Sequence, residues 1–220
     1  MRKFFSFAAI AIMLSLSILS QNAYAQSETP KIEVGAQYSL LRLGLRKAPN
    51  IQPPGANGSS VLALDSRVTD SGFGGRVTFN FTDYLSVEGE INFFPEERVN
   101  YAEPFYINSR RTQGLFGVKA GARSEKLGVF AKARPGFMHF GEGAADPRIQ
   151  TLLPIPARVS STEFALDLGG VLELYPSRRV SVRFDLGDTI IHYGRSSLSG
   201  GAPGSTTHNL QFTTGVGLRF

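Results

Sequence analysis

Residues 72–94 read GFGGRVTFNFTDYLSVEGEINFF, and apolar and polar side chains alternate along almost the whole stretch. A period of two residues is that of a β-strand whose two faces meet different surroundings. The alternation breaks around Asp83 and then resumes. The stretch therefore predicts two antiparallel strands, residues 72–82 and 84–94, joined by a tight turn.

The same period recurs along the rest of the chain, where no long helical pattern interrupts it. Together with the opening pair, the alternating segments predict an all-β chain of eight strands. The six further segments are residues 31–43, 112–123, 127–138, 162–175, 180–193 and 208–220.

The connections between these segments alternate in length. Short links lie around Asp83, at 124–126 and at 176–179. Long links carry most of the prolines and span 44–71, 95–111, 139–161 and 194–207. Membrane-spanning barrels have short turns at one end and long loops at the other. The pattern predicts one antiparallel up-and-down barrel with both chain ends on the short-turn side.

The first residues are typical of an export signal. Arg2 and Lys3 precede the apolar run from Phe4 to Leu19, and Ala23-Tyr24-Ala25 follows as a cleavage site. We expect residues 1–25 to be a cleaved signal peptide and residues 26–220 to form the barrel domain. An uncleaved anchor is the alternative, but the run is shorter than the ~20 residues of a spanning helix.

Composition excludes several other classes. The chain has no cysteine, which excludes a disulfide-stapled module and a thiolate metal site. Its net charge is +5, but the basic residues are spread along the chain, with no run that would follow a phosphate backbone. We expect no nucleic acid partner. A mean hydropathy of −0.06 does not exclude membranes, because spanning strands are apolar only on alternate residues.

The residues on the polar face of the predicted strands indicate whether this face points into the barrel or away from it. It carries equal numbers of basic and acidic residues, as a narrow closed lumen requires, because an unpaired buried charge is costly. The apolar face would then meet lipid, whereas a lipocalin-like soluble carrier would turn it inward. The basic residues are Arg76, Lys119, Arg123, Lys132, Arg134, Arg183 and Arg219; the acidic ones are Glu33, Glu88, Glu90, Glu163, Asp167, Glu173 and Asp185.

Aromatic residues gather toward the predicted strand ends, and Phe220 ends the last strand. Such residues form interfacial belts around membrane barrels. The predicted belt consists of Tyr38, Tyr84, Phe93, Phe94, Phe137, Tyr175 and Tyr193.

The chain resembles the OmpA-type and OmpX-type eight-stranded outer-membrane β-barrel family, the outer membrane protein beta-barrel domain. The Ala23-Tyr24-Ala25 motif, the alternating segments and the final LQFTTGVGLRF carry the resemblance over residues 31–220. It implies that the strand ending at Phe220 is read by the barrel-insertion machinery. Full-length OmpA-type proteins continue into a peptidoglycan-binding domain, whereas this sequence stops at the eighth strand, so the resemblance does not imply tethering.

Catalytic patterns are incomplete. In IIHYGRSS, residues 190–197, His192 faintly resembles the histidine of barrel lipid A deacylases, but Gly194 stands where their serine would lie, and Ser196 is two residues further. Histidine pairs with metal-ligand spacing are absent. Glu88 and Glu90 favour lumen ion pairs over acid–base chemistry. We therefore expect no enzyme, and no catalytic, metal or cofactor-binding residue.

Two further motifs have structural interpretations. GFGG at 72–75 lacks the lysine and helix of a phosphate-binding loop. YPSRR at 175–179 is interpreted as a periplasmic turn with exposed charge.

These features predict a structural or surface-exposed protein of the cell outer membrane, with long extracellular loops and a charge-filled lumen. We expect it to be a monomer surrounded by outer-membrane lipid and lipopolysaccharide. Recognition, if any, would fall to the loops at 44–71, 95–111, 140–161 and 194–207, since scaffolded loops carry binding. A narrow pore, a soluble periplasmic ligand carrier and a lipid A-modifying enzyme remain the alternatives.

Overall fold

The computed structural model describes residues 30–43, 68–95, 106–107, 110–145, 158–194 and 204–220. The predicted signal peptide, residues 1–25, lies outside them, as does most of each long connection. Within the described residues no helix is long and apolar enough to cross a membrane.

The described residues form nine β-strands, eight of which correspond to the eight predicted segments. The additional strand, β4, has two residues and pairs with β6 alone. The strands are β1 Ile32–Leu43, β2 Val68–Asn80, β3 Leu85–Phe94, β4 Tyr106–Ile107, β5 Arg111–Arg123, β6 Leu127–Ala145, β7 Arg158–Ser177, β8 Val180–Tyr193 and β9 Ser205–Arg219.

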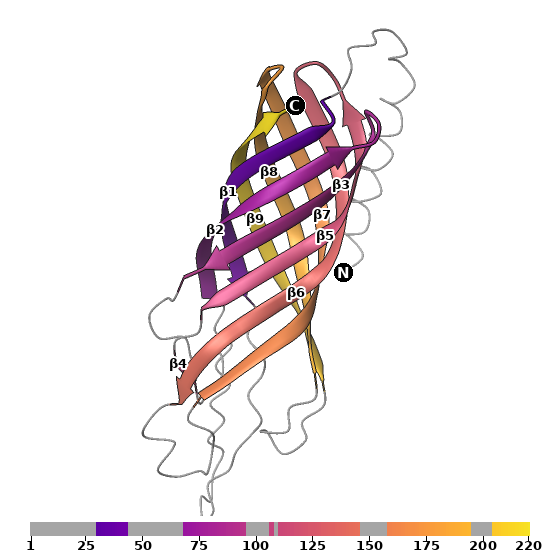
Figure 1. The fold of residues 1–220 in the computed structure, drawn as a ribbon. Helices are drawn as coiled ribbons and strands as arrows, with labels where there is room; N and C mark the ends of the chain where they lie inside the picture. The colour runs from indigo at the N-terminus through magenta and orange to yellow at the C-terminus, as the bar shows by residue number, and fades with distance from the viewer. Residues whose placement is uncertain (1–29, 44–67, 96–105, 108–109, 146–157, 195–203) are drawn as a thin grey trace, which may run out of the picture.

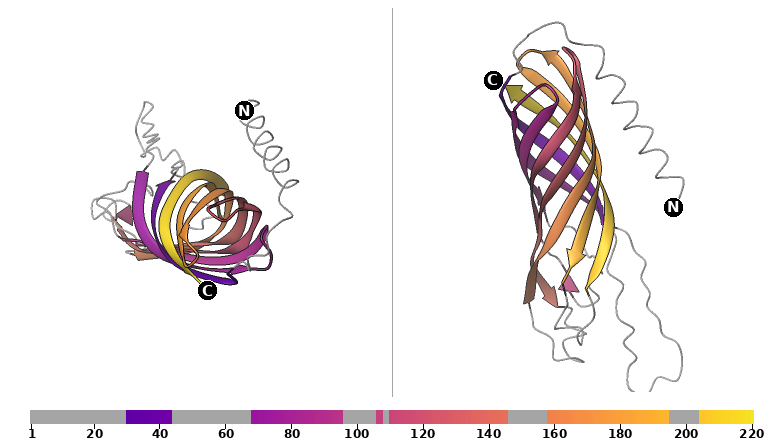
Figure 2. Two further views of the ribbon diagram at one scale, coloured as in Figure 1. Left: turned by 90° about the horizontal axis from the view of Figure 1, so that it is seen from above. Right: turned by 90° about the vertical axis from the view of Figure 1, so that its right-hand side faces the viewer.

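The eight long strands close into a barrel (Figures 1 and 2). Around the wall their order is β6-β5-β3-β2-β1-β9-β8-β7, and β7 pairs with β6 to complete the circle. Every pairing is antiparallel. Closure leaves no unpaired edge in the wall. It also makes strands four places apart in this order, such as β3 and β8, face each other across the lumen.

The two ends of the barrel differ, as the connection lengths predict. One end, here called the turn end, carries the short links after β2, β5 and β7. The C-terminus lies there too (Figure 1). The opposite end, here called the loop end, carries the long connections.

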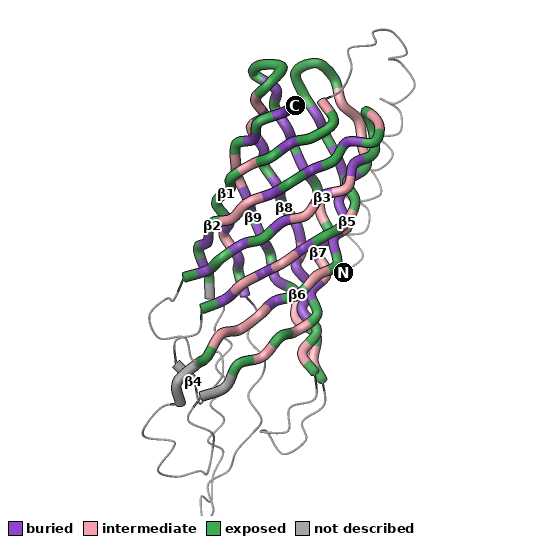
Figure 3. The backbone as a smooth tube through the Cα atoms, viewed as in Figure 1, coloured by how far each residue is buried: buried purple, intermediate pink, exposed green. Residues whose placement is uncertain are grey.

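Buried and exposed residues alternate along the strands (Figure 3). The buried parity is the polar one: in β3, for example, Ser86, Glu88, Glu90 and Asn92 are buried. The apolar parity is exposed on the outside of the wall. This is the arrangement predicted for a membrane barrel and the reverse of a carrier with an apolar interior.

Three members of the predicted aromatic belt are placed differently from the prediction. Tyr38, Tyr84, Phe93 and Phe137 are exposed on the outer surface. In contrast, Phe94 and Tyr175 are buried inside the barrel, and Tyr193 packs against the interior apolar cluster. Their inward parity decides this, because neighbouring residues of a strand point to opposite faces.

Several strands extend further at the loop end than predicted. β6 continues to Ala145 and β7 begins at Arg158, with a register shift between Phe140 and Gly143. β2 begins at Val68 and β9 at Ser205. Backbone pairing continues there although the contrast between the two faces fades, so the alternation underestimates strand length.

Candidate functional site

The lumen collects the charged side chains that the sequence places on the polar parity. All fourteen predicted lumen residues lie on the inward side of their strands. Twelve of them are buried, whereas Arg123 and Glu163 are half-buried. Burial of this many charges requires that each finds a partner, since an isolated charge in a low-dielectric interior is strongly disfavoured.

Arg134 on β6 is the centre of this network. Its Nη1 donates to Glu88 Oε1 at 2.8 Å and to Glu90 Oε2 at 2.6 Å. Its Nη2 lies 2.5 Å from Asp167 Oδ2 and 3.4 Å from Asp185 Oδ2. The planar guanidinium fork can reach several carboxylates at once, which a lysine ammonium does less well. One cation therefore joins strands β3, β6, β7 and β8.

Arg183 crosses the barrel. From β8 its Nη1 and Nη2 donate to the two carboxylate oxygens of Glu88 on β3, at 2.7 and 2.8 Å. Bidentate pairs of this kind are among the stronger hydrogen-bonded interactions in proteins. Because β3 and β8 face each other across the barrel, the pair spans the lumen.

Further ion pairs fill the turn end. Lys119 Nζ lies 2.5 Å from Glu173 Oε1, and Arg76 Nη2 lies 2.7 Å from Glu33 Oε1. Lys132 binds both Asp167 and Asp185. Tyr175 donates to Glu173 at 2.6 Å, and the Arg219 guanidinium lies 4.0 Å from the centre of the Tyr175 ring. Buried Tyr175 is thus part of this network.

A layer of amides and hydroxyls follows toward the loop end. Gln113 on β5 and Gln211 on β9 exchange two hydrogen bonds, at 2.9 and 3.1 Å. These strands also lie four places apart around the barrel, so a second, uncharged contact spans the lumen. Asn92 donates to Gln113 at 2.8 Å and accepts from Gln37 at 2.8 Å.

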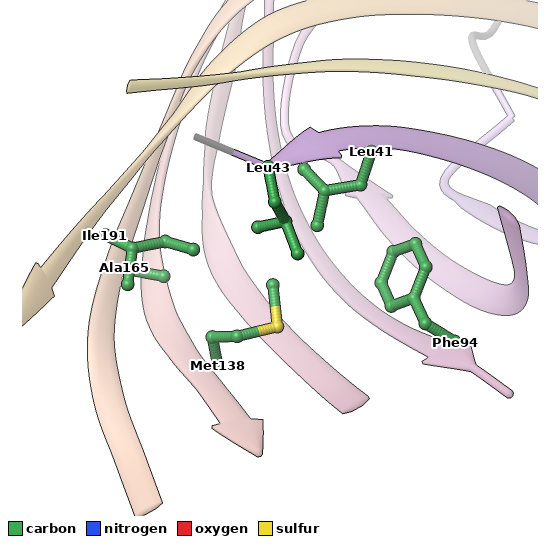
Figure 4. Packing of buried hydrophobic residues seen from close by; sticks show 6 residues of the cluster. All are labelled: Leu41, Leu43, Phe94, Met138, Ala165 and Ile191. Carbon is green, nitrogen blue, oxygen red and sulfur yellow. The ribbon is translucent and has the colours of Figure 1, made fainter. Parts of the chain in front are cut away.

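The loop end of the lumen contains an apolar cluster, which the sequence analysis did not predict. Six buried side chains from five strands pack together there (Figure 4). They lie on the inward parity, where a polar residue was expected. Phe94 is 1% exposed, whereas its neighbour Phe93 is 42% exposed. The cluster consists of Leu41, Leu43, Phe94, Met138, Ala165 and Ile191.

One buried ion pair was also missed. Asp70 on β2 and Arg111 on β5 form a salt bridge, and the Arg111 guanidinium lies 5.9 Å from the centre of the Phe140 ring. Both residues belong to the strand extensions that the sequence analysis assigned to loops. The pair adds one charge of each sign, so the interior stays balanced.

The histidines lie on the outer surface near the loop end. His192 Nδ1 lies 3.0 Å from Thr206 Oγ1, so its neighbour is a threonine and not a carboxylate. Gly194 donates its backbone N–H to Glu163 at 3.0 Å. Ser196 lies outside the described residues. No group of three potential metal ligands occurs within the part of the chain that the structure describes.

The remaining motifs have structural roles. Glu88 and Glu90 both bind Arg134, which favours an ion-pair role over an acid–base pair. The GFGG glycines lie in β2, where a Cβ on Gly72 would come within 2.6 Å of the Phe94 ring. Residues 178–179 form the turn between β7 and β8, with both arginines exposed.

Comparisons with known proteins agree with this architecture. The sequence matches the family model described as outer membrane protein beta-barrel domain over residues 11–220. No curated protein matches it significantly. Among solved structures, the N-terminal β-barrel domain of Pseudomonas aeruginosa OprF is 9% identical, with a TM-score of 0.51, over 87% of this chain and 98% of that one.

Two further solved structures have lower TM-scores. Neisserial surface protein A is 12% identical with a TM-score of 0.46, over 86% of this chain and 97% of that one. Ail, the attachment invasion locus protein of Yersinia pestis, is 12% identical with a TM-score of 0.44 over the same shares. At such identities, structural similarity supports the fold alone. This support rests on the match to the OprF domain.

Proposed function

Because the chain belongs to the outer membrane protein beta-barrel domain family, we propose that it is a structural barrel of the outer membrane. In this proposal the barrel does not conduct, and it displays its long loops outside the cell. The observation that carries this proposal is a lumen crossed by side chains from opposite walls. Arg183 and Glu88 cross it in the charged section, and Gln113 and Gln211 cross it in the amide layer. The apolar cluster lies beyond them.

The outer surface supports the membrane location. Its exposed side chains include Phe73, Phe116, Phe164 and Leu186. In water such a surface would expose a large apolar area, which soluble monomers rarely do. A membrane accepts it, because lipid chains are as apolar as these residues.

The absence of an enzymatic role is part of the proposal. Glu88, Glu90, Asp167 and Asp185 are all bound to basic partners. Carboxylates held in this way are poor candidates for proton transfer. Binding would then depend on the loops at the loop end, which is where recognition residues on a rigid scaffold commonly lie.

Insertion would use the C-terminal strand. The Phe220 side chain is exposed at the turn end, and its backbone exchanges hydrogen bonds with Ile32 at 2.8 and 3.2 Å. We expect Phe220→Ala to lower the amount of protein assembled in the outer membrane without changing the unfolding midpoint of the assembled fraction. An unchanged yield would contradict a role for this residue in insertion.

Heat-modifiability and conductance test the proposal together. A closed barrel from the outer-membrane fraction should migrate faster on SDS gels before boiling than after. The same protein in planar bilayers should give no discrete conductance steps. Regular steps would instead support a narrow pore. A single band from the soluble fraction would support a periplasmic carrier.

Lipid A modification provides the remaining test. Membranes from cells that produce the protein should contain lipid A with the acyl pattern of cells that lack it. A changed pattern that His192→Ala abolishes would replace the structural proposal with the enzymatic one.

A further inference from the structure

Charged and imidazole side chains are scarce on the outer surface of the described strands. Those on the outward parity of regular pairing include Arg42, His139, Asp188, His192 and His208, and all lie in the loop-end half of their strands. Glu142, exposed beside the register shift of β6, lies at the same end. Ionisable residues on a lipid-facing surface are costly and commonly mark a function. Their confinement to the loop end therefore indicates a function at that end of the outer surface.

Arg42, His208 and His192 lie on three adjacent strands, β1, β9 and β8. Arg42 pairs with Leu210, two residues from His208; His208 pairs with Ile190, two residues from His192. Each residue is thus a diagonal neighbour of the next on one face, roughly 7–8 Å apart by ordinary sheet geometry. We call these three residues the cationic arc.

The two imidazoles of the arc are oriented by their neighbours. His208 Nδ1 lies 2.6 Å from Asp188 Oδ2, and the other oxygen of Asp188 accepts the backbone N–H of Asn209 at 2.9 Å. His192 Nδ1 lies 3.0 Å from Thr206 Oγ1. Both contacts use Nδ1. Within the described residues no hydrogen bond reaches either Nε2, so this nitrogen is available to a ligand outside the wall.

The arc lies next to the apolar outer surface of the barrel, on its loop-end side. Leu210 and Ile190, which pair with Asp188 and His208, belong to the apolar outer surface, and Leu210 is 53% exposed. His208 has a side chain that is 68% exposed. In a bilayer, headgroups begin where the apolar band of the barrel ends. The arc lies at the loop-end border of the apolar outer surface.

We propose that the cationic arc binds the phosphate of lipid headgroups in the outer leaflet. The inference rests on the proposed membrane location. An arginine fork binds phosphate through two parallel N–H donors. A protonated imidazole whose Nδ1–H is held by Asp188 donates its Nε2–H to a phosphate oxygen. The partner is therefore an anionic, phosphorylated lipid, anchored by its acyl chains on Leu210 and Ile190.

Protonation should control the strength of this binding. An imidazole donates from both nitrogens only when it is protonated. The charged groups beside the two imidazoles on the outer face are Asp188 on β8 and Arg42 on β1. The Glu163 carboxylate on β7 lies on the inward side and accepts the backbone N–H of Gly194. Binding should strengthen as the pH falls from about 7.5 to about 5.5.

The test uses the full barrel in zwitterionic detergent with diphosphoryl lipid A as the probe. Native mass spectrometry counts the lipid A molecules that remain bound at each pH. The variant Arg42→Gln/His192→Gln/His208→Gln should bind about tenfold less at the lower pH, as expected for loss of charge-assisted hydrogen bonds. Its binding should also no longer depend on pH.

A matched control is Arg178→Gln/Arg179→Gln, which removes exposed positive charge from the turn end. This variant should bind lipid A as the wild type does. Equal binding by the arc variant, or an equal loss in both variants, would overturn the proposal. So would full displacement by inorganic phosphate at the same concentration, because the arc would then be a site for free anions.

Heat-modifiability separates this inference from the proposed function. Both variants should keep the faster unboiled band, because none of the substituted residues lies inside the lumen. A heat-modifiable barrel without lipid A binding would reject the arc and leave the structural proposal intact. Loss of the band in the wild type would reject both.

Discussion

The two sections of the lumen stabilise the barrel in different ways. At the turn end, Arg134 and Arg183 join carboxylates from several strands through hydrogen bonds of fixed geometry. At the loop end, Phe94, Met138 and Leu41 pack without directional contacts. Removal of one charged partner leaves others buried and unpaired, whereas truncation of an apolar side chain costs lost contacts and a cavity but leaves no unpaired charge. The charged section should therefore tolerate substitution less well.

The largest expected effect is at Arg134. Arg134→Met keeps most of the side-chain volume but removes the cation that Glu90 pairs with. It also removes one of the basic partners of Glu88, Asp167 and Asp185. Breaking a buried pair costs about 3–5 kcal/mol, and a shared cation should reach the upper part of that range. Urea titration of the barrel in lipid vesicles, followed by the unboiled band on SDS gels, measures the change.

The control for this variant is Arg178→Met, at the exposed turn between β7 and β8. A surface substitution of this kind should change the free energy of unfolding by no more than about 0.5 kcal/mol. If the two methionine variants unfold at the same urea concentration, the network around Arg134 does not stabilise the barrel.

The apolar section should respond next. Met138 is fully buried in the apolar cluster. Met138→Ala should lower the free energy of unfolding by about 2–5 kcal/mol, through lost contacts and a cavity. Met138→Leu, which keeps the volume, should cost less than about 1.5 kcal/mol. The same urea titration measures both, and equal losses would mean that packing volume does not matter at this position.

A double-mutant cycle measures the contact across the barrel. Glu88→Gln, Arg183→Met and the double variant should show a coupling energy within about 0.5–3 kcal/mol, as for residues in direct contact. The double variant should lose less than the sum of the two single losses. Strict additivity would show that the pair does not interact across the lumen.

The smallest net effect is expected for the double variant of the amide layer between the two sections. Gln113→Leu alone should cost about 1–3 kcal/mol, because Gln211 loses its partner. Gln113→Leu/Gln211→Leu should restore most of this loss, since replacing both partners by apolar groups is nearly neutral. Failure of the second substitution to rescue the first would place the boundary of the apolar section further toward the loop end.

The fold and the charge pattern of the lumen could be predicted from the sequence. Eight alternating segments predicted eight strands, and their polar parity predicted all fourteen charged residues on the inward side. It did not predict Asp70 and Arg111, because pairing extends beyond the alternating part of β2 and β5. It also placed Phe94 and Tyr175 in an outer belt, where composition favours aromatics.

By itself, then, the amino-acid order determined which residues share a face, because side-chain direction in a strand follows from position alone. Only the tertiary structure decided which residues meet. Closure brings β3 opposite β8 and β5 opposite β9, so Glu88 reaches Arg183 and Gln113 reaches Gln211. It also gathers inward-facing Leu41, Phe94 and Met138 into one apolar layer. Such contacts depend on strand order and register around a closed wall, which no local pattern encodes.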